Sequence, residues 1–290
     1  MRPMKPFRKI YVEISNRCNL RCSFCPGTAR PLGAMTEENF ARLLPKLAPF
    51  TDFLYFHLMG EPLCHPQLER FLELAGEAGF RVILTTNGTL LSRMQEVLLA
   101  APALHKVNIS LQAFEGSGMA VDFDTYLAGC FGFGQAAAGK KIVCYRLWNR
   151  GGLDSCNPAI LRGLEGHFPQ PWVQERRGIR LSHRVYLELG EKFDWPDLSA
   201  PQTAGEIHCY GLKDQLGILW DGTVVPCCLD HEGDIPLGNV FQQELSEILT
   251  SPRAEALKKG FQTGNPPEPL CRRCGYATRF SAAAAAGSAR

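Results

Sequence analysis

The chain has 290 residues, and its 31 lysine and arginine residues nearly balance its 29 aspartate and glutamate residues, which leaves a net charge of +2. This balance gives no electrostatic case for nucleic acid or an anionic membrane as the main partner. The first fifteen residues are basic but lack the apolar core of a secretory signal, and no window is apolar enough to span a membrane. Twelve cysteines without a secretion signal indicate metal or redox work in a reducing compartment, so we expect a cytoplasmic protein.

Apolar runs and segments of helical periodicity alternate through the first two thirds of the chain. Strands are expected at residues 9–14, 53–58, 81–86, 106–111 and 141–147. Repeated strand–helix units predict a parallel sheet that is closed or partly closed into a barrel. In such folds the chemistry lies at the carboxyl ends of the strands, and the most unusual residues of this chain follow its first three predicted strands.

Two helices between these strands carry clear end signals. Thr36 is predicted to cap the first helix, and Pro66 is predicted to occupy the first position of the second, which Gly79 caps at its end. Apolar residues recur at helical spacing in both segments, namely Phe40, Leu43, Leu44 and Leu47 in the first and Leu68, Phe71, Leu72 and Ala75 in the second. Both segments are therefore predicted to be amphipathic helices.

The last third of the chain has a different character. Residues 150–205 show a weaker pattern, which fits either a sixth strand–helix unit with long loops or a bridge between two parts. After residue 208, Asp221 and Gly222 between two apolar runs predict a β-hairpin. Two short helices are expected at about 241–250 and at 252–259, the second with Ser251 as its cap. We therefore expect a core at 1–205, a small hairpin-and-helix domain at 206–280 and a disordered, low-complexity tail at 281–290.

Three cysteines stand close together directly after the first predicted strand. Cys18, Cys22 and Cys25 have the spacing CX3CX2C, which suits three corners of an iron–sulfur cubane. A [4Fe–4S] cluster takes four ligands, so three thiolates leave one iron with an open position, as in a catalytic metal site. The alternatives are a zinc site that lacks a ligand and three incidental buried thiols.

This motif resembles the hallmark of radical S-adenosylmethionine (SAM) enzymes, including the aromatic residue, here Phe24, before the third cysteine. The resemblance spans the chain from Tyr11 to about Cys274. It implies an α/β fold, with a partial (β/α)6 TIM-like barrel followed by a small C-terminal cluster-binding domain of a β-hairpin and helices. It also implies that the open iron binds the amino and carboxylate groups of SAM. Reductive cleavage of SAM would then give a 5′-deoxyadenosyl radical that abstracts hydrogen from substrate.

Further motifs at successive strand ends match the family's weaker signals. The segment from Met59 to Pro62 resembles the family's GGEP motif, with Met59 in place of the first glycine. Gln112 stands where an acidic residue is common in the family. Taken alone, each motif is a weak signal, because GEP (60–62) and the Asn87-Gly88 dipeptide are sequences common in turns. The resemblance implies that SAM is bound by Phe24, Met59, Gly60, Glu61, Asn87, Ser110 and Gln112.

A second cysteine set lies in the C-terminal third. Its members are Cys209, Cys227, Cys271 and Cys274, of which the last two form CX2C. Four thiolates could bind zinc tetrahedrally or complete an iron–sulfur cluster. The pattern resembles the twitch domain, the shortened form of the SPASM extension, which implies one auxiliary [4Fe–4S] cluster ligated entirely by protein. Cys228 is an alternative to Cys227, although the spacing favours Cys227.

The remaining reactive residues give weaker signals. Arg146 at the end of the fifth predicted strand, and Asp214, Asp230 and His231 beside the hairpin, are candidate substrate contacts or else solvated surface residues. Four other cysteines have no partner at ligand spacing and are expected to be buried apolar-like residues: Cys64, Cys130, Cys144 and Cys156.

These features predict a radical SAM enzyme that abstracts hydrogen from a small polar metabolite. The outcome would be oxidation by dehydrogenation or radical fragmentation by a lyase, with the closed auxiliary cluster in electron transfer and a flavodoxin- or ferredoxin-type protein as reductant. One alternative is peptide or protein modification, as in the maturation of sulfatases or of ribosomally synthesised peptides. The non-enzymatic alternatives are an iron–sulfur electron carrier and a zinc-stabilised binding module.

Overall fold

The structure is a computed structural model, and it describes residues 5–176 and 178–280. The chain forms two compact units, each built from discontinuous segments. One unit, called here the barrel unit, comprises residues 17–27 and 55–192. The other, called here the cluster unit, comprises residues 1–16, 28–54 and 193–290.

The barrel unit contains a sheet in the strand order β3-β4-β5-β8-β7-β6. Its strands are β3 (Arg81–Thr86), β4 (Leu104–Ser110), β5 (Ile142–Arg150), β8 (Val185–Glu191), β7 (Gly178–Ser182) and β6 (Val173–Glu175). The first four run parallel to one another, whereas β7 pairs in antiparallel fashion with both β8 and β6. The carboxyl ends of β3, β4 and β5 therefore lie at the same edge of the sheet.

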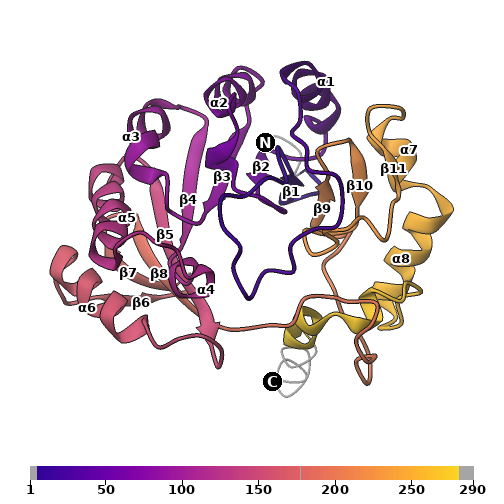
Figure 1. The fold of residues 1–290 in the computed structure, drawn as a ribbon. Coiled ribbons are helices and arrows are strands. Elements are labelled where there is room, and N and C mark those ends of the chain that lie inside the picture. Colours follow the sequence, from indigo (N-terminus) through magenta and orange to yellow (C-terminus); the bar gives the residue numbers. More distant parts are fainter. Residues whose placement is uncertain (1–4, 177, 281–290) are drawn as a thin grey trace. The chain divides into compact units, whose positions relative to one another are not determined.

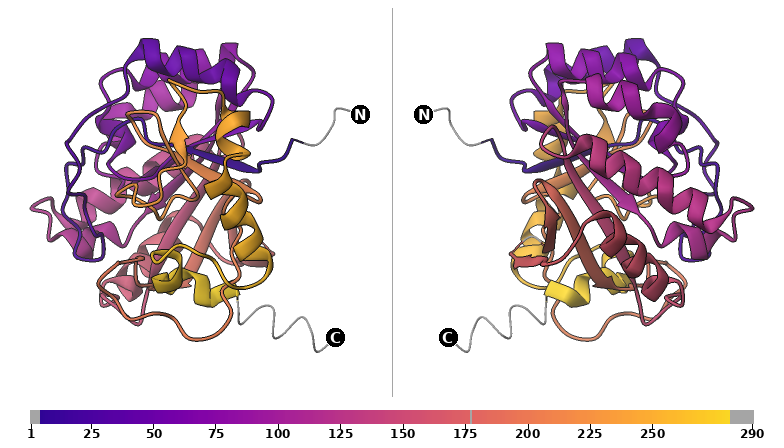
Figure 2. Two further views of the ribbon diagram at one scale, coloured as in Figure 1. Left: turned by 90° about the vertical axis from the view of Figure 1, so that its right-hand side faces the viewer. Right: turned by 90° about the vertical axis from the view of Figure 1, so that its left-hand side faces the viewer.

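Helices cover one face of this sheet (Figures 1 and 2). They are α2 (Leu68–Glu77), α3 (Leu91–Ala100), α5 (Phe123–Ala137) and α6 (Asn157–His167). The unit also contains the 3-10 turn η1 (Pro62–Cys64) and the short helix α4 (Ala113–Ser117). Alternate strand residues such as Val107, Ile109, Val143 and Tyr145 are completely buried. Because successive side chains of a strand point to opposite faces, Lys106 and Asn108 of β4 lie on the face opposite to Val107 and Ile109.

The cluster unit contains a smaller sheet. β1 (Lys9–Val12) pairs in parallel with β9 (Gln215–Ile218), which continues in antiparallel fashion to β10 (Thr223–Val225) and β11 (Gly238–Asn239). Its helices are α1 (Glu37–Leu47), α7 (Leu245–Leu249) and α8 (Pro252–Gln262), followed by the turns η2 (Cys271–Arg273) and η3 (Gly275–Ala277). Strand β2 (Phe53–Phe56) contains the boundary between the two units.

The predicted elements are present with small shifts of their ends. Thr36 caps α1 by accepting a hydrogen bond from the backbone N–H of Asn39, and the predicted stripe of α1 is buried. The hairpin predicted at Asp221 and Gly222 joins β9 to β10. Gly222 has φ +89°, and a Cβ added there would lie 2.3 Å from the ring of Phe241, so this turn requires glycine.

The predicted ends of α2 are wrong. The helix begins at Leu68 with Gln67 as its N-cap, because Pro66 belongs to a turn in which the ring of His65 accepts a hydrogen bond from the Gln67 N–H. At the other end Ala78 is the C-cap, and Gly79 follows it in the left-handed conformation. The buried stripe of α2 is the predicted one.

Residues 150–205, whose sequence pattern is weak, contain more secondary structure than the sequence indicates. After α6 this region forms β6, β7 and β8, and β8 pairs in parallel with β5, as the alternative of a further strand–helix unit required. The antiparallel pair β6 and β7 was not predicted, because these short strands are mostly exposed or half-buried and lack an apolar alternation. The predicted disordered tail lies outside the described residues.

None of the described helices combines the length and the apolar character that crossing a membrane requires.

Candidate active site

The loop that carries the first three cysteines is held by backbone hydrogen bonds to two other segments of the barrel unit. The carbonyl of Arg17 accepts from the Glu61 N–H at 2.8 Å, and the Ser23 N–H donates to the Gly116 carbonyl at 2.7 Å. Within the loop, the Cys25 N–H donates to the Cys22 carbonyl at 3.0 Å, which closes a tight turn. The loop therefore has a defined path although many of its side chains are exposed.

Phe24 packs beside α4. A Cβ added to Gly116 would lie 2.4 Å from the Phe24 ring, so the absence of a side chain at Gly116 lets the ring approach the backbone of α4. The Phe24 side chain is 43% exposed, which leaves part of the ring open to a ligand.

The three thiols lie close enough to influence one another electrostatically. Burial, followed by the charges of Cys25 and Cys18, raises the pKa of Cys22 to about 12. Burial also raises the pKa of Cys18 and of Cys25. Iron cations would remove the repulsion among the thiolates, so this donor set fits three corners of a cubane. Among the described residues, no group of three or more His, Cys, Asp or Glu side chains converges on the position of a single metal ion.

Glu61, in the GEP segment after β2, is buried and accepts three hydrogen bonds from the protein. Its Oε1 accepts from the Leu63 N–H at 3.0 Å and from the Thr86 hydroxyl at 2.8 Å, and its Oε2 accepts from the Asn87 N–H at 2.7 Å. Burial raises the pKa of Glu61 to about 7 against the lowering effect of these donors. The carboxylate therefore joins the GEP turn to the end of β3.

The two residues before Glu61 have different roles in the turn. Met59 is 9% exposed and packs in the core, so its replacement of glycine is accommodated there. Gly60 has φ +78°, a conformation that a side chain would strain. The backbone of the turn therefore requires glycine at position 60.

Asn87 directly follows β3 and joins that strand end to the cysteine loop. Its Nδ2 lies 2.9 Å from Asn19 Oδ1 and 3.9 Å from Cys18 Sγ. The hydroxyl of Tyr126 on α5 donates to the Asn87 carbonyl at 2.8 Å. Sequence reasoning missed Asn19 and Tyr126, and the only signal for Asn19 was its position within the motif.

Ser110 and Gln112 lie at the end of β4. Ser110 is the last residue of the strand and stands in register with Arg146 of β5. Gln112 precedes α4, and its Oε1 is buried without a hydrogen-bond partner among the described residues. An unpaired buried acceptor is unfavourable, so this oxygen is available to a donor from a ligand.

Arg146 is largely enclosed rather than a solvated surface residue. Its guanidinium lies over the Trp148 ring at 4.6 Å and pairs with Glu188 at 3.1 Å, and its side chain is 18% exposed. Lys106 also approaches Glu188, at 3.4 Å. Burial and then the Arg146 charge lower the pKa of His57 to about 4. The sequence analysis did not single out His57, Lys106 or Glu188.

The second cysteine set lines a hollow in the cluster unit. Cys209, Cys227, Cys271 and Cys274 all line it, and the other walls are mainly apolar. Burial is the largest cause of the raised pKa of Cys227, and the charges of Cys209, Cys228, Cys271 and Cys274 add to it. A hollow lined by four thiols from three segments of the chain fits a cluster ligated entirely by protein.

Cys228 differs from its neighbour Cys227. It is not among the residues that line the hollow. Its thiol interacts with Tyr11, a hydrogen bond that lowers the pKa of Cys228 although burial raises it to about 11 overall. These contacts favour Cys227 over Cys228 as the fourth candidate ligand in the second cysteine set.

Of the three candidate substrate residues beside the hairpin, Asp230 and His231 contact the backbone of their own loop, whereas the Asp214 backbone contacts the start of β1. Asp230 lines the hollow, but its carboxylate accepts from the backbone N–H groups of Asp234 and Ile235, and burial raises its pKa to about 6. The ring of His231 lies 3.2 Å from the Leu229 carbonyl and packs edge-on against Trp195. The Asp214 carbonyl accepts from two N–H groups at the start of β1, and its Oδ1 is buried without a partner among the described residues.

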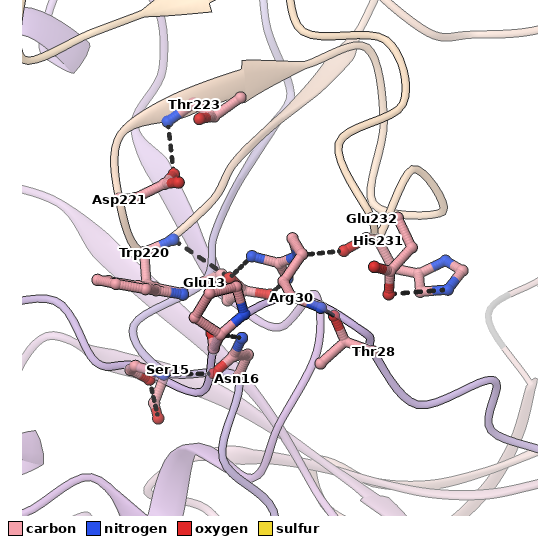
Figure 3. Close-up of polar contacts among 12 residues, drawn as sticks. Glu13, Ser15, Asn16, Thr28, Arg30, Trp220, Asp221, Thr223, His231 and Glu232 are labelled. Carbon is pink, nitrogen blue, oxygen red and sulfur yellow. Dashed lines mark hydrogen bonds and ion pairs between the residues drawn. The ribbon is translucent and has the colours of Figure 1, made fainter.

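A buried ion pair joins Glu13, directly after β1, to Arg30, which also contacts the loop between β10 and β11 (Figure 3). Arg30 donates to both oxygens of Glu13, at 2.6 and 3.0 Å, and its Nε donates to the His231 carbonyl at 2.8 Å. Glu13 Oε2 also accepts from the Trp220 N–H, and the Glu232 carboxylate accepts from the Ala29 N–H. The segment after the cysteine loop is thus fastened to the loop that follows Cys227.

Comparisons with known proteins identify two domains, and each contains one of the two cysteine sets. Residues 12–120 match the sequence model of the radical SAM superfamily, and residues 209–275 match that of SPASM, an iron–sulfur cluster-binding domain. A GTP 3′,8-cyclase of Synechococcus sp. (strain WH7803) is 29% identical over 221 residues. That alignment covers 67% of this chain and 61% of the relative, so the chain spans about three fifths of the cyclase.

A second relative aligns over nearly its whole length. The S-adenosyl-L-methionine-dependent 2-deoxy-scyllo-inosamine dehydrogenase of Niallia circulans is 22% identical over 284 residues, 93% of each chain.

Solved structures show the same fold. BtrN in complex with AdoMet and 2-DOIA has a TM-score of 0.60 and 19% identity, covering 93% of this chain and 94% of BtrN. Streptococcus suis SuiB bound to its precursor peptide SuiA has a TM-score of 0.59 and 16% identity, covering 93% and 71%. The chain thus has the predicted fold class, a mixed α/β fold with a TIM-like partial barrel. The chain contains a radical SAM domain and a C-terminal SPASM domain, and these domains imply SAM, a [4Fe–4S] cluster and an auxiliary iron–sulfur cluster as its cofactors.

Proposed function

We propose that this enzyme abstracts a hydrogen atom from a small polar metabolite and oxidises or fragments the product radical. When bound, the [4Fe–4S] cluster and SAM supply the electron transfer and the 5′-deoxyadenosyl radical for that abstraction. Cys18, Cys22 and Cys25 would hold three irons of this cluster and leave the fourth to SAM. The observation that carries the proposal is the loop with three clustered thiols beside the GEP turn and the ends of β3 and β4.

The residues of the barrel unit would orient SAM rather than react with it. Gln112 Oε1, a buried acceptor without a protein partner, would accept a donor from the bound cofactor. The exposed part of the Phe24 ring and the backbone of Met59 and Gly60 would form other walls of the site. Exclusion of water by such walls protects a reactive radical from side reactions.

The auxiliary site would serve electron transfer. Cys209, Cys227, Cys271 and Cys274 would ligate every iron of one cluster, which leaves no open position for substrate. Such a cluster would accept the electron of the substrate radical, and this supports oxidation over fragmentation. The similarity over 93% of both chains to a SAM-dependent dehydrogenase supports the same choice.

Arg146 is the substrate contact that the geometry favours. It lies in the middle of β5, in register with Ser110 at the end of β4, and its guanidinium contacts Glu188 and Trp148. We further propose a flavodoxin- or ferredoxin-type reductant and a cytoplasmic location, since all twelve cysteines are free thiols.

Peptide modification is the second candidate, because SuiB, solved with its precursor peptide, has the same fold. A panel of substrates separates the two candidates: an aminocyclitol, GTP and mixed short peptides, each tested for accelerated formation of 5′-deoxyadenosine. Acceleration by a small molecule and not by peptides supports the leading proposal. Acceleration by a peptide alone overturns it.

The central experiment is anaerobic reconstitution with iron and sulfide, followed by dithionite and SAM. We expect about eight irons per chain, from two cubanes, and slow formation of 5′-deoxyadenosine. Cys22→Ala is expected to abolish this product, because the first cluster loses a ligand. Cys271→Ala is expected to retain SAM cleavage and to lose substrate turnover.

The two variants also test the alternatives. If Cys22→Ala still cleaves SAM, the first cysteine loop is not the cleavage site. If the wild-type protein binds about eight irons but never cleaves SAM, it is an electron carrier. About four irons with bound zinc would overturn the auxiliary cluster alone.

A further inference from the structure

The carboxamide of Asn87 has a fixed orientation. Its Oδ1 accepts from the Thr89 N–H at 3.0 Å and from the Thr89 hydroxyl at 2.7 Å. Since a backbone N–H can only donate, the oxygen must face Thr89 and the amino group must face the cysteine loop. There Nδ2 lies 2.9 Å from Asn19 Oδ1 and 3.9 Å from Cys18 Sγ, within reach of a hydrogen bond to sulfur.

Thr89 and Asn19 close this arrangement into a ring. Asn19 Nδ2 donates to the Thr89 hydroxyl at 2.8 Å, and that hydroxyl donates onward to Asn87. Asn19 Oδ1 accepts from Asn87 in return. Each of the three side chains thus fixes the orientation of the next, and the free N–H of Asn87 is directed towards Cys18.

The backbone of Asn87 is held on both sides by buried groups. Its N–H donates to Glu61 Oε2 at 2.7 Å, and its carbonyl accepts from the Tyr126 hydroxyl at 2.8 Å. Glu61 is 2% exposed and Tyr126 is 4% exposed, so neither contact competes strongly with water. The side chain of Asn87 therefore projects from a rigid turn.

Glu61 also holds the start of the loop that carries Cys18, the acceptor of the Asn87 amide. The Glu61 N–H donates to the carbonyl of Arg17, the residue before Cys18. Glu61 thus holds the Asn87 turn through its side chain and the start of the cysteine loop through its backbone. The distance between the Asn87 amide and Cys18 is consequently set by one short, buried connection.

We propose that Asn87 is a positioning residue for the first cluster, acting through an N–H···S hydrogen bond to Cys18. This inference rests on the proposed ligation of that cluster by Cys18. Hydrogen bonds to ligating sulfur stabilise the more negative, reduced form of a cluster and so raise its reduction potential. The Leu20 N–H, 3.4 Å from the same sulfur, supplies a second such bond from within the loop.

The test is the midpoint potential of the first cluster, measured without SAM by an EPR-monitored redox titration of the reconstituted full chain. The relevant signal is the one that changes when SAM is added to a parallel sample. Asn87→Leu keeps the size of the side chain and removes the donor, so we expect a more negative potential. Tyr126→Phe is the matched control, because it loosens the same turn without removing the N–H.

We expect Tyr126→Phe to keep the wild-type potential, and Asn87→Ala to repeat the shift of Asn87→Leu. An unchanged or more positive potential in the Asn87 variants overturns the inference, as does an equal shift in Tyr126→Phe. Failure of both Asn87 variants to load iron at the first site also overturns it, because Asn87 would then be needed for the loop itself. Failure of the proposed function is seen separately, as a wild-type protein that does not cleave SAM.

Discussion

His57 illustrates how the environment of one residue controls its charge. It follows β2, and burial together with the Arg146 charge lowers its pKa from 6.5 to about 4. In the unfolded chain His57 gains its proton near its ordinary pKa, whereas in the folded chain it does so only near pH 4. This difference contributes stability above pH 6.5 that is lost as the pH falls towards 4.

The pH dependence of unfolding tests this assignment. Between pH 7 and pH 5 we expect His57 to remove about 1 to 2 kcal/mol from the free energy of unfolding. His57→Gln is expected to show a correspondingly smaller loss, measured by urea unfolding of the metal-free protein at both pH values. Equal losses in the two proteins would show that other groups cause the pH dependence.

Cys227 and Cys228 form a matched pair for the auxiliary site. Only Cys227 lines the hollow, while Cys228 interacts with Tyr11. Cys227→Ala is therefore expected to lower the iron content from about eight to about four per chain, whereas Cys228→Ala is expected to keep it. Iron analysis with EPR checks both, and the opposite ranking would assign the ligand to Cys228.

Among the elements, the end of β1 is joined to the segment around Arg30 by a buried ion pair between Glu13 and Arg30. The side chains of Arg30 and Glu13 are 12% and 0% exposed. If one of them is removed, water therefore cannot solvate the charge of the other. Burial raises the pKa of Glu13, although the bidentate contact with Arg30 acts in the opposite direction. The pair therefore serves mainly to define the geometry of the segments that it joins.

Breaking this pair is expected to be costly. Arg30→Met leaves the Glu13 charge buried, and we expect a loss of about 3 to 5 kcal/mol in the free energy of unfolding. The double variant Glu13→Leu with Arg30→Met leaves no charge behind and is expected to lose less. Urea unfolding of both checks the comparison, and a double variant that is less stable than Arg30→Met would contradict it.

Elements formed by interactions between residues close in sequence were predicted well, and elements that depend on other contacts were not. The cap and stripe of α1 and the hairpin at Gly222 depend on neighbours a few residues away, so their residue types were sufficient. The start of α2 depends on a turn made by the ring of His65, which propensity does not register. The strands β6 and β7 have little buried surface to leave a pattern.

At the scale of the whole molecule, the two cysteine sets were visible because ligand spacing is written in the chain. Their supporting residues were not, since Tyr126 meets Asn87 across 39 positions and Arg30 meets the His231 carbonyl across 201. Such contacts arise from the fold, and common residue types such as Tyr and Asn carry no signal of them. The predicted core at 1–205, the predicted small domain at 206–280 and the assignment of cysteine ligands to the two clusters remain predictions.

The central claim is that three thiolates leave one iron of the first cluster free for SAM. Electron–nuclear double resonance on the reduced, reconstituted protein tests it most directly, with SAM labelled by ¹⁵N at its methionyl amino group. We predict a ¹⁵N coupling to the cluster, retained in Cys271→Ala because the auxiliary site is not involved. An assembled first cluster with bound SAM but no ¹⁵N coupling would contradict the account.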